Sequence, residues 1–157
     1  MATDSGIIAR IEGWFVSQLK GLTVNGAVVF KTADHWRWQL QAGGRDQFEA
    51  LAPFALVSYD PQPPQREGDY DLCINLGIAV AIGVAGGEAG EARIGCTARP
   101  GYSKLHDLVI NLFEDAHPGA GFGVDNFHFA GELVLQEAER RFAGQLQFEA
   151  KYLVIPD

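Results

Sequence analysis

The sequence predicts an α+β fold: one domain over residues 1–157, with two amphipathic helices on a mainly antiparallel or mixed β-sheet that has one unusually long strand. Apolar residues recur at helical spacing in two segments, at about residues 5–21 and 101–116. Asp71–Ala85 instead alternates with the period of two that is typical of a strand. The remaining strand patterns show no regular alternation with helices, which argues against a parallel α/β sheet.

The first helix and the segment that follows it have recognisable boundaries. Ser5 or Asp4 is expected to cap the helix, and Gly21 to end it. The apolar face of this helix consists of Ile7, Ile8, Ile11, Trp14, Phe15 and Leu19. Asn25–Gly26 then predicts a tight turn before a short strand at Ala27–Lys31.

The next strand pattern lies between two segments rich in turn residues. Pro53–Asp60 is compact and apolar, and it predicts a buried strand that begins at a proline. Pro61–Asp69 is rich in proline and polar residues, and it predicts an irregular connection. Gly86–Gly95 follows the long strand and predicts a flexible loop.

The long strand has two different faces. The even positions are large: Leu72, Ile74, Leu76, Ile78, Val80, Ile82 and Val84. The odd positions from Cys73 to Ala85 are Cys73, Asn75, Gly77, Ala79, Ala81, Gly83 and Ala85. The large face belongs in the core. The small face must accept another element at close range, either a helix of the same chain or an adjacent subunit.

The length of this strand raises a second question. At about 3.3 Å per residue, its 15 residues would span roughly 50 Å. A domain of this size is only about 30–35 Å across. The strand is therefore expected to bend at Gly77 or Gly83, or to project from the body with its distal end, around Ala81–Gly87.

The C-terminal third combines the second helix with further strands. The helix is expected from about Gly101 to Ala116, with its end at His117–Pro118–Gly119. Glu132–Phe142 is ambiguous, because "ELVLQ" favours a strand and "QEAERR" favours a helix. The alternation from Leu146 to Val154 predicts a half-buried strand.

Composition and charge exclude some classes of function. The net charge is −8 and there is no basic stripe, which disfavours binding of nucleic acid. The longest uncharged run, Leu72–Gly87, is too short for a membrane-spanning helix and has the period of a strand. The first residues lack the pattern of a signal peptide, so no leader is expected. Cys73 and Cys96 are expected to be core thiols, with a disulfide between them left open.

Motifs for catalysis, cofactors and metals are weak. Ser103 follows Gly101 without the second glycine of a nucleophile elbow, and is expected early in a helix. "GAGFG" at Gly119–Gly123 precedes a strand rather than a helix, so it predicts a turn and not a phosphate loop. The four histidines lack metal-ligand spacing. No catalytic residue, cofactor or metal site is therefore predicted.

The order and spacing of these segments resemble the tail-terminator, or tail-completion, proteins of tailed phages, in particular the small tail protein of Mu-like prophages. The similarity covers most of the chain. It rests on "IIARIEGWFVSQL", "PFALVSYD", "DLCINLGIAVAIGVA", "GYSKLHDLVINLF" and "GQLQFEAKYLVI". None of these is a sharp signature motif, so no site residue is transferred from the family.

The resemblance implies a structural virion protein and not an enzyme. Proteins of this kind form a ring, commonly a hexamer, which caps the tail tube and offers a docking surface to the head connector. The implied partners are copies of the chain itself, the tube protein and the connector. The implied location is the virion tail, and the host cytoplasm during assembly. No cofactor comes with the family.

The residues expected at the subunit or tube interface lie in two loops and at the end of the long strand. Pro61–Gly68 and Gly86–Arg99 are expected at this interface because both loops are long and flexible and lie next to the long strand. The candidate residues are Ala81, Gly83, Ala85, Gly86, Gly87, Glu88, Gln65 and Arg66.

Two other functions remain open from the sequence. One is a different neck or baseplate component of the same kind of assembly. The other is a small-molecule-binding or hydrolytic α+β domain. That alternative predicts a closed pocket in which His106, Ser103 and Asp107 converge.

Overall fold

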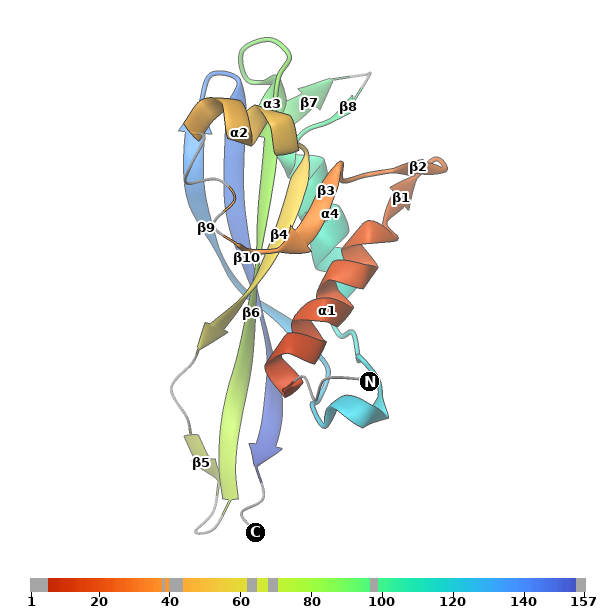
Figure 1. Cartoon of the computed structure of the whole chain (residues 1–157), viewed down its shortest axis with the longest axis vertical. Helices are drawn as coiled ribbons and strands as arrows, with labels where there is room; N and C mark the ends of the chain where they lie inside the picture. The colour runs from red at the N-terminus through yellow and green to blue at the C-terminus, as the bar shows by residue number, and fades with distance from the viewer. Residues whose placement is uncertain are drawn as a thin grey trace.

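The computed structural model describes residues 6–37, 39, 44–61, 65–67, 71–96 and 99–154 (Figure 1). Side chains are not described for residues 44–46, 65–67, 71–74, 120 and 153–154. The helices are α1 (Ile7–Lys20), α2 (Gly44–Leu51), α3 (Glu91–Ile94), α4 (Tyr102–Phe113) and the 3₁₀ turn η1 (Ala120–Phe122). The strands are β1 (Thr23–Val24), β2 (Ala27–Val28), β3 (Thr32–His35), β4 (Phe54–Pro61), β5 (Gln65–Glu67), β6 (Asp71–Ala85), β7 (Gly95–Cys96), β8 (Arg99–Pro100), β9 (His128–Ala138) and β10 (Arg141–Val154).

A mixed sheet forms the centre of the molecule and confirms the α+β prediction. Its order is β3-β4-β6-β10-β9, and β5 pairs with the beginning of β6. Among the described strand pairs of this sheet, only β3–β4 is parallel. The two longest strands, β6 and β10, pair along their whole length in a register that joins Ala85 to Arg141 and Leu72 to Val154.

The large face of β6 forms the main core, as its pattern predicts. Its described large residues, from Leu76 to Val84, are buried in one core cluster with residues of α1 and α4. Phe15 of α1 lies at the centre, fully buried, with its ring 4.2 Å from that of Phe113 and 4.9 Å from that of Phe127. Both predicted helices are thus confirmed, and they lie on the same face of the sheet (Figure 1).

The small face of β6 is covered by a helix of the same chain near its C-terminal end. The short helix α2 packs there, in a second buried cluster formed by Phe48, Phe54, Leu56, Ala81 and Ala143. The sequence pattern predicted no helix between Ala27–Lys31 and Pro53–Asp60, so α2 was not expected. A helix of eight residues is marginal by itself, so burial of Phe48 stabilises it.

Further along the small face, two neighbouring strands interact directly across β6. The Gln147 amide of β10 donates a hydrogen bond to the Asp60 carboxylate of β4. Asp60 pairs with Gly77, and Gln147 with Ala79. Gly77 and Ala79 of β6 are small enough for the two side chains to meet above them. This explains why both positions on the small face carry small residues.

Gly83→Ala should destabilise the protein by about 1–3 kcal/mol, the usual cost of overpacking a core. A Cβ at Gly83 would lie 2.1 Å from Cζ of Phe54, whose ring occupies the space above the glycine. Urea unfolding measures the loss. The double variant with Phe54→Leu should recover part of the stability, whereas additive losses would show that the ring is not the obstacle.

The end of β6 that extends beyond the helices is not the predicted one. Ala81 and Val84 are buried in the body. The beginning of β6 projects instead, together with β5 and the end of β10, and this three-stranded extension is called the arm (Figure 1). β6 continues without a break from Asp71 to Ala85. The domain accommodates this long strand because one end of it projects from the body.

Three further expectations are corrected, and the ambiguity at Glu132–Phe142 is resolved. Residues 65–67 of the expected irregular connection form β5, because they pair with β6. Part of the loop after β6 forms the short helix α3. The stretch "QEAERR" is the end of β9 and a turn, since pairing with β10 overrides its helical propensity. Cys96 is an exposed free thiol rather than a core residue, and the Cys73 side chain lies outside the described part.

Candidate assembly interface

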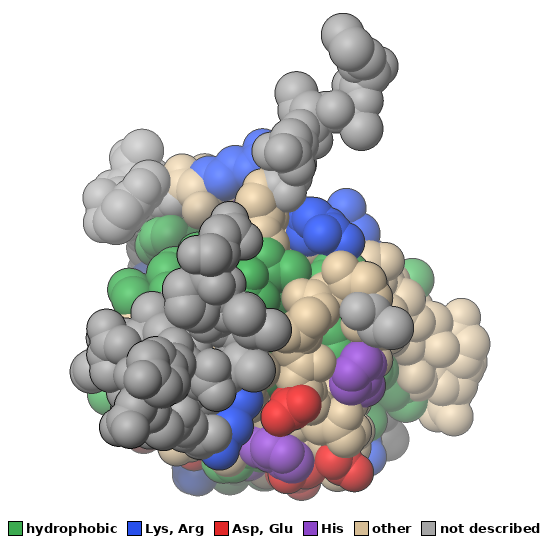
Figure 2. Space-filling view, turned by 90° about the horizontal axis from the view of Figure 1, so that it is seen from below, with side chains coloured by type: hydrophobic (Ala, Val, Ile, Leu, Met, Phe, Trp, Pro, Cys, Tyr) green, Lys and Arg blue, Asp and Glu red, His purple; other side chains and the backbone are tan. Residues whose placement is uncertain are grey.

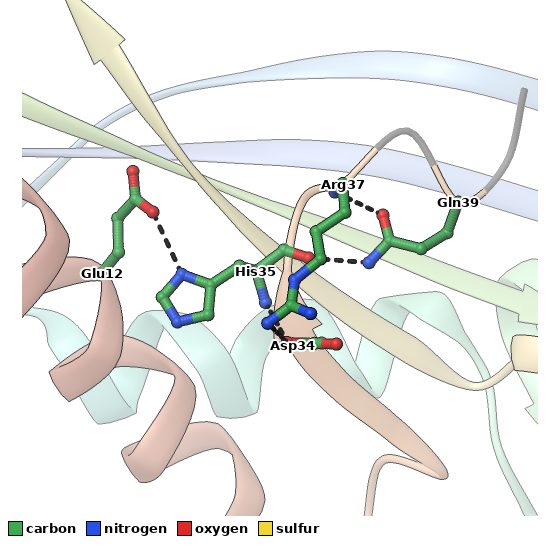
Figure 3. Close-up of polar contacts among 5 residues, drawn as sticks. All are labelled: Glu12, Asp34, His35, Arg37 and Gln39. Carbon is green, nitrogen blue, oxygen red and sulfur yellow. Dashed lines mark hydrogen bonds and ion pairs between the residues drawn. The ribbon is translucent and has the colours of Figure 1, made fainter.

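The sheet has two edges, and on the β3 edge the backbone groups of His35 are hydrogen-bonded by the side chains of Asp34 and Gln39 (Figure 3). The Trp36 amide bonds to β4, so the alternation of the strand directs the backbone groups of His35 outward. The His35 amide donates to Oδ1 of Asp34 at 2.7 Å. The His35 carbonyl accepts a bond from the amide of Gln39 at 2.7 Å. Another strand therefore finds this position already hydrogen-bonded.

The side chains that close the β3 edge are themselves held in place. Arg37 lies 3.5 Å from the Asp34 carboxylate, and its backbone amide donates to Oε1 of Gln39. The His35 ring lies 3.1 Å from the Glu12 carboxylate of α1 (Figure 3). The cluster therefore has a structural role: it occupies the outward backbone groups of His35 and joins β3 to α1.

The opposite edge, β9, is open along most of its length. At its beginning, the Phe129 amide donates to the Glu114 carboxylate at 2.6 Å and so points away from β10. Phe129 pairs with Phe148, and the alternation of an antiparallel ladder then directs the backbone groups of Glu132, Val134 and Glu137 outward too. No backbone hydrogen bond from another described segment reaches these three residues.

The side chains on this edge are apolar and exposed. Leu133, Val134 and Leu135 are 58%, 53% and 48% exposed. The register shifts twice along the β9–β10 pair and leaves Ala130 and Leu135 without a direct partner. Such bulges strengthen the local twist of an edge strand. Three consecutive exposed aliphatic residues on an unpaired edge are a typical site for association with another chain.

Helix α4 holds β9 in place through a polar contact. The Tyr102 hydroxyl donates to Oε2 of Glu132 at 2.7 Å, and Nε2 of His106 lies 3.1 Å from the same oxygen. Burial above all, followed by the hydrogen bond to Glu132 and its charge, raises the pKa of Tyr102 well above its ordinary value. The tyrosine therefore remains a donor at neutral pH, and Glu132 stays oriented.

The enzymatic alternative predicted that three polar residues would converge in a closed pocket. His106 does approach Asp107, with Nδ1 2.9 Å from Oδ1. However, Ser103 and Asp107 are both exposed on α4. The described clefts are lined by other residues. The other ring nitrogen of His106 contacts Glu132 of β9.

A cleft of about 610 Å³ lies where the arm meets the body. Its lining includes Asp125, His128, Glu149 and Lys151. Histidine and acidic side chains are seen together from this end of the molecule (Figure 2). Because acidic and basic groups both line the cleft, its charge does not select for an anion or a cation.

The candidate interface residues from the sequence do not form one surface. Gly83 lies beneath the ring of Phe54, Ala81 is buried in the second cluster, and Ala85 packs against that cluster. Gly86, Gly87 and Glu88 follow at that end of β6, where the Glu88 amide donates to Glu91 and its side chain is exposed. Gln65 and Arg66 are at the other end, in β5, with side chains outside the described part.

The apolar edge of β9 was not among these candidates. One signal in the sequence could have indicated it. Successive strand residues point to opposite faces, so the run Leu133–Leu135 must place an aliphatic residue on each face. Only the tertiary structure shows that neither face of β9 is covered along this run.

Glu114→Gln should reduce stability at neutral pH, and the difference should shrink in acid. The Phe129 amide, and to a lesser degree His128, lower the pKa of Glu114 from its ordinary 4.5. A lowered pKa in the folded state stabilises above the unfolded pKa, and this contribution is lost as the pH falls through the folded value. Urea unfolding midpoints at pH 7 and about pH 3 test this.

The matched control for Glu114 is Glu137→Gln, which removes the same charge from the neighbourhood of β9 and leaves the Phe129 amide bonded. If the difference in stability between Glu114→Gln and the wild type is equally large at both pH values, the stabilising role assigned to the Glu114 carboxylate is wrong.

Comparisons with known proteins add no assignment: neither the family models nor the curated proteins contain a match to this chain. In the described part of the chain, no helix combines the length and apolar character needed to cross a membrane. Nor does that part bring together three His, Cys, Asp or Glu side chains that could hold a metal ion.

Proposed function

We propose that this protein is a structural component of a phage tail: a ring-forming terminator that caps the tail tube and presents a docking surface to the head. Its role is assembly, and its partners are copies of itself, the tube protein and the head connector. The observation that carries the proposal is the open β9 edge with its exposed run Leu133–Leu135. The resemblance in segment order supports the same class of protein.

The shape of the subunit supports this role in a second way. A ring subunit that caps a tube needs lateral surfaces for its neighbours and a separate end for the tube. The β9 edge lies along the side of the sheet, whereas the arm projects beyond the helices at one end (Figure 1). Lateral and axial contacts can therefore be made by different parts of the chain.

The test is whether the protein stops growth of tail tubes. Purified tube protein from the same phage or prophage is polymerised with and without the full chain, and tube lengths are measured by electron microscopy. We expect shorter tubes with additional density at one end. Unchanged tubes without bound protein would refute the proposal. Binding only to purified baseplates or necks would favour the alternative component.

A further inference from the structure

The structure contains a second exposed apolar element, at the opposite edge of the sheet from β9. It is the two-stranded hairpin β1–β2, which projects from the body between α1 and β3 (Figure 1). Helix α1 packs against β3 and β4, so the hairpin belongs to the β3 side. Val28 at its end is 64% exposed. The hairpin and β9 are thus two different surfaces on opposite flanks.

The hairpin is built as a local unit with unused pairing capacity. Asn25 and Gly26 form its turn with φ of 53° and 81°, as the Asn-Gly pair predicts. Thr23 pairs with Val28, and the Val29 amide bonds to the Leu22 carbonyl at 3.1 Å. An isolated two-stranded hairpin is marginally stable in water, so pairing with a further strand would stabilise it.

The charges of the two surfaces are complementary. The segment 20–31 carries Lys20 and Lys31, both exposed, and no acidic residue. The segment 128–139 carries Glu132, Glu137 and Glu139, all exposed, and neither lysine nor arginine. Two exposed lysines therefore flank the uncharged hairpin, and three exposed glutamates lie along the apolar β9 edge before Arg140 and Arg141. Such complementarity selects one partner surface over another.

Two other ways of pairing β9 are less favourable. A second copy's β3 offers an edge at which His35 is already bonded to Asp34 and Gln39. A two-fold pair of β9 strands brings two acidic edges together. In the register centred on Val134, Glu132 would oppose a second copy's Glu137, because their partners on β10 lie equally far from that of Val134. Like charges directly opposite one another destabilise a strand pair.

We propose that the β1–β2 hairpin of one copy docks on the open β9 edge of a second copy, with Val28 against the run Leu133–Leu135. The contact joins two different surfaces, so each copy offers one surface to each neighbour. Such contacts close into a ring where the rotation allows it. This inference rests on the proposed ring and names the two surfaces that form it.

Site-specific crosslinking tests the pairing. Both native cysteines are replaced by serine, and Val28→Cys and Val134→Cys are made as separate full-length proteins. Under mild oxidation we expect a disulfide-linked dimer in the mixture, and none from either variant alone. A dimer from Val134→Cys alone would show two-fold pairing of β9 and overturn the inference. Ile94→Cys, at an equally exposed aliphatic residue, is the control and should give no dimer with either variant.

Complementation supplies a second readout. Val28→Asp and Val134→Asp each remove one surface and leave the other, so each alone should stay monomeric. Their mixture should form a dimer that grows no further, because one intact hairpin meets one intact β9 edge. Assembly of Val28→Asp alone to the wild-type size would overturn the inference.

The outcomes separate this inference from the proposed function. Wild-type rings that cap tubes but give no mixed crosslink refute the docking and leave the function. A mixed crosslink without any effect on tubes supports the docking and refutes the terminator role. A wild-type chain that stays monomeric, with or without tubes, refutes both.

Discussion

Val134→Asp should leave the subunit folded and weaken its self-association by about 30-fold or more, the loss that a central hot-spot contact produces. Val134 is 53% exposed and lies at the middle of the open run on β9. Its backbone groups point outward, so a partner strand would pass directly beside its side chain. A carboxylate there would be desolvated on association and repelled by Glu132 and Glu137.

Size-exclusion chromatography with light scattering over a concentration series measures this effect, and circular dichroism checks the fold. Ile94→Asp is the matched control, because Ile94 is 66% exposed but lies in α3, outside both proposed surfaces. We expect the control to assemble like the wild type. Equal loss in both variants would mean that added negative charge, and not the β9 edge, determines assembly.

Phe15→Ala should destabilise the protein by about 3–5 kcal/mol, the range for removing a buried aromatic side chain. The Phe15 ring is fully buried between α1 and the sheet. It lies 4.2 Å from the ring of Phe113, 4.9 Å from that of Phe127 and 6.0 Å from that of Phe148.

A loss of this size is a large share of the about 5–15 kcal/mol that stabilises a typical domain. Urea unfolding followed by fluorescence and circular dichroism measures it. Phe129→Ala is the control, because this aromatic residue lies on the exposed part of β9 and should cost less. If Phe15→Ala unfolds the chain outright, Phe15→Leu keeps most of the volume and gives a measurable loss. Equal stability of wild type and Phe15→Ala would contradict the assigned core.

The two surfaces of β6 show why assembly need not involve the long strand itself. Its large face is buried by α1 and α4, and its small face by α2 and by the Asp60–Gln147 bond. The strand therefore acts as the central support of the sheet. In the described part of the chain, the surfaces left for partners are the edge strand β9, the projecting hairpin and the arm.

Local pattern alone determined most of the elements of this protein. The apolar spacing in residues 7–19 and 102–113, the alternation in Asp71–Ala85 and the Asn25–Gly26 turn all predicted what the structure contains. Helical and strand periods follow from backbone geometry, and each element must turn its apolar side inward. The small side of β6 likewise predicted that another element packs close to this face.

The tertiary structure alone decided which element fills each position and which edge stays open. The sequence left open whether a helix or a subunit covers the small face, and it placed the projecting end of β6 near Ala81–Gly87 instead of at the arm. It also did not separate a strand from a helix at Glu132–Phe142. These outcomes depend on pairing between strands that are distant in the chain. Local propensity does not encode strand order, so β9 became an exposed edge only when β10 paired with both β6 and β9.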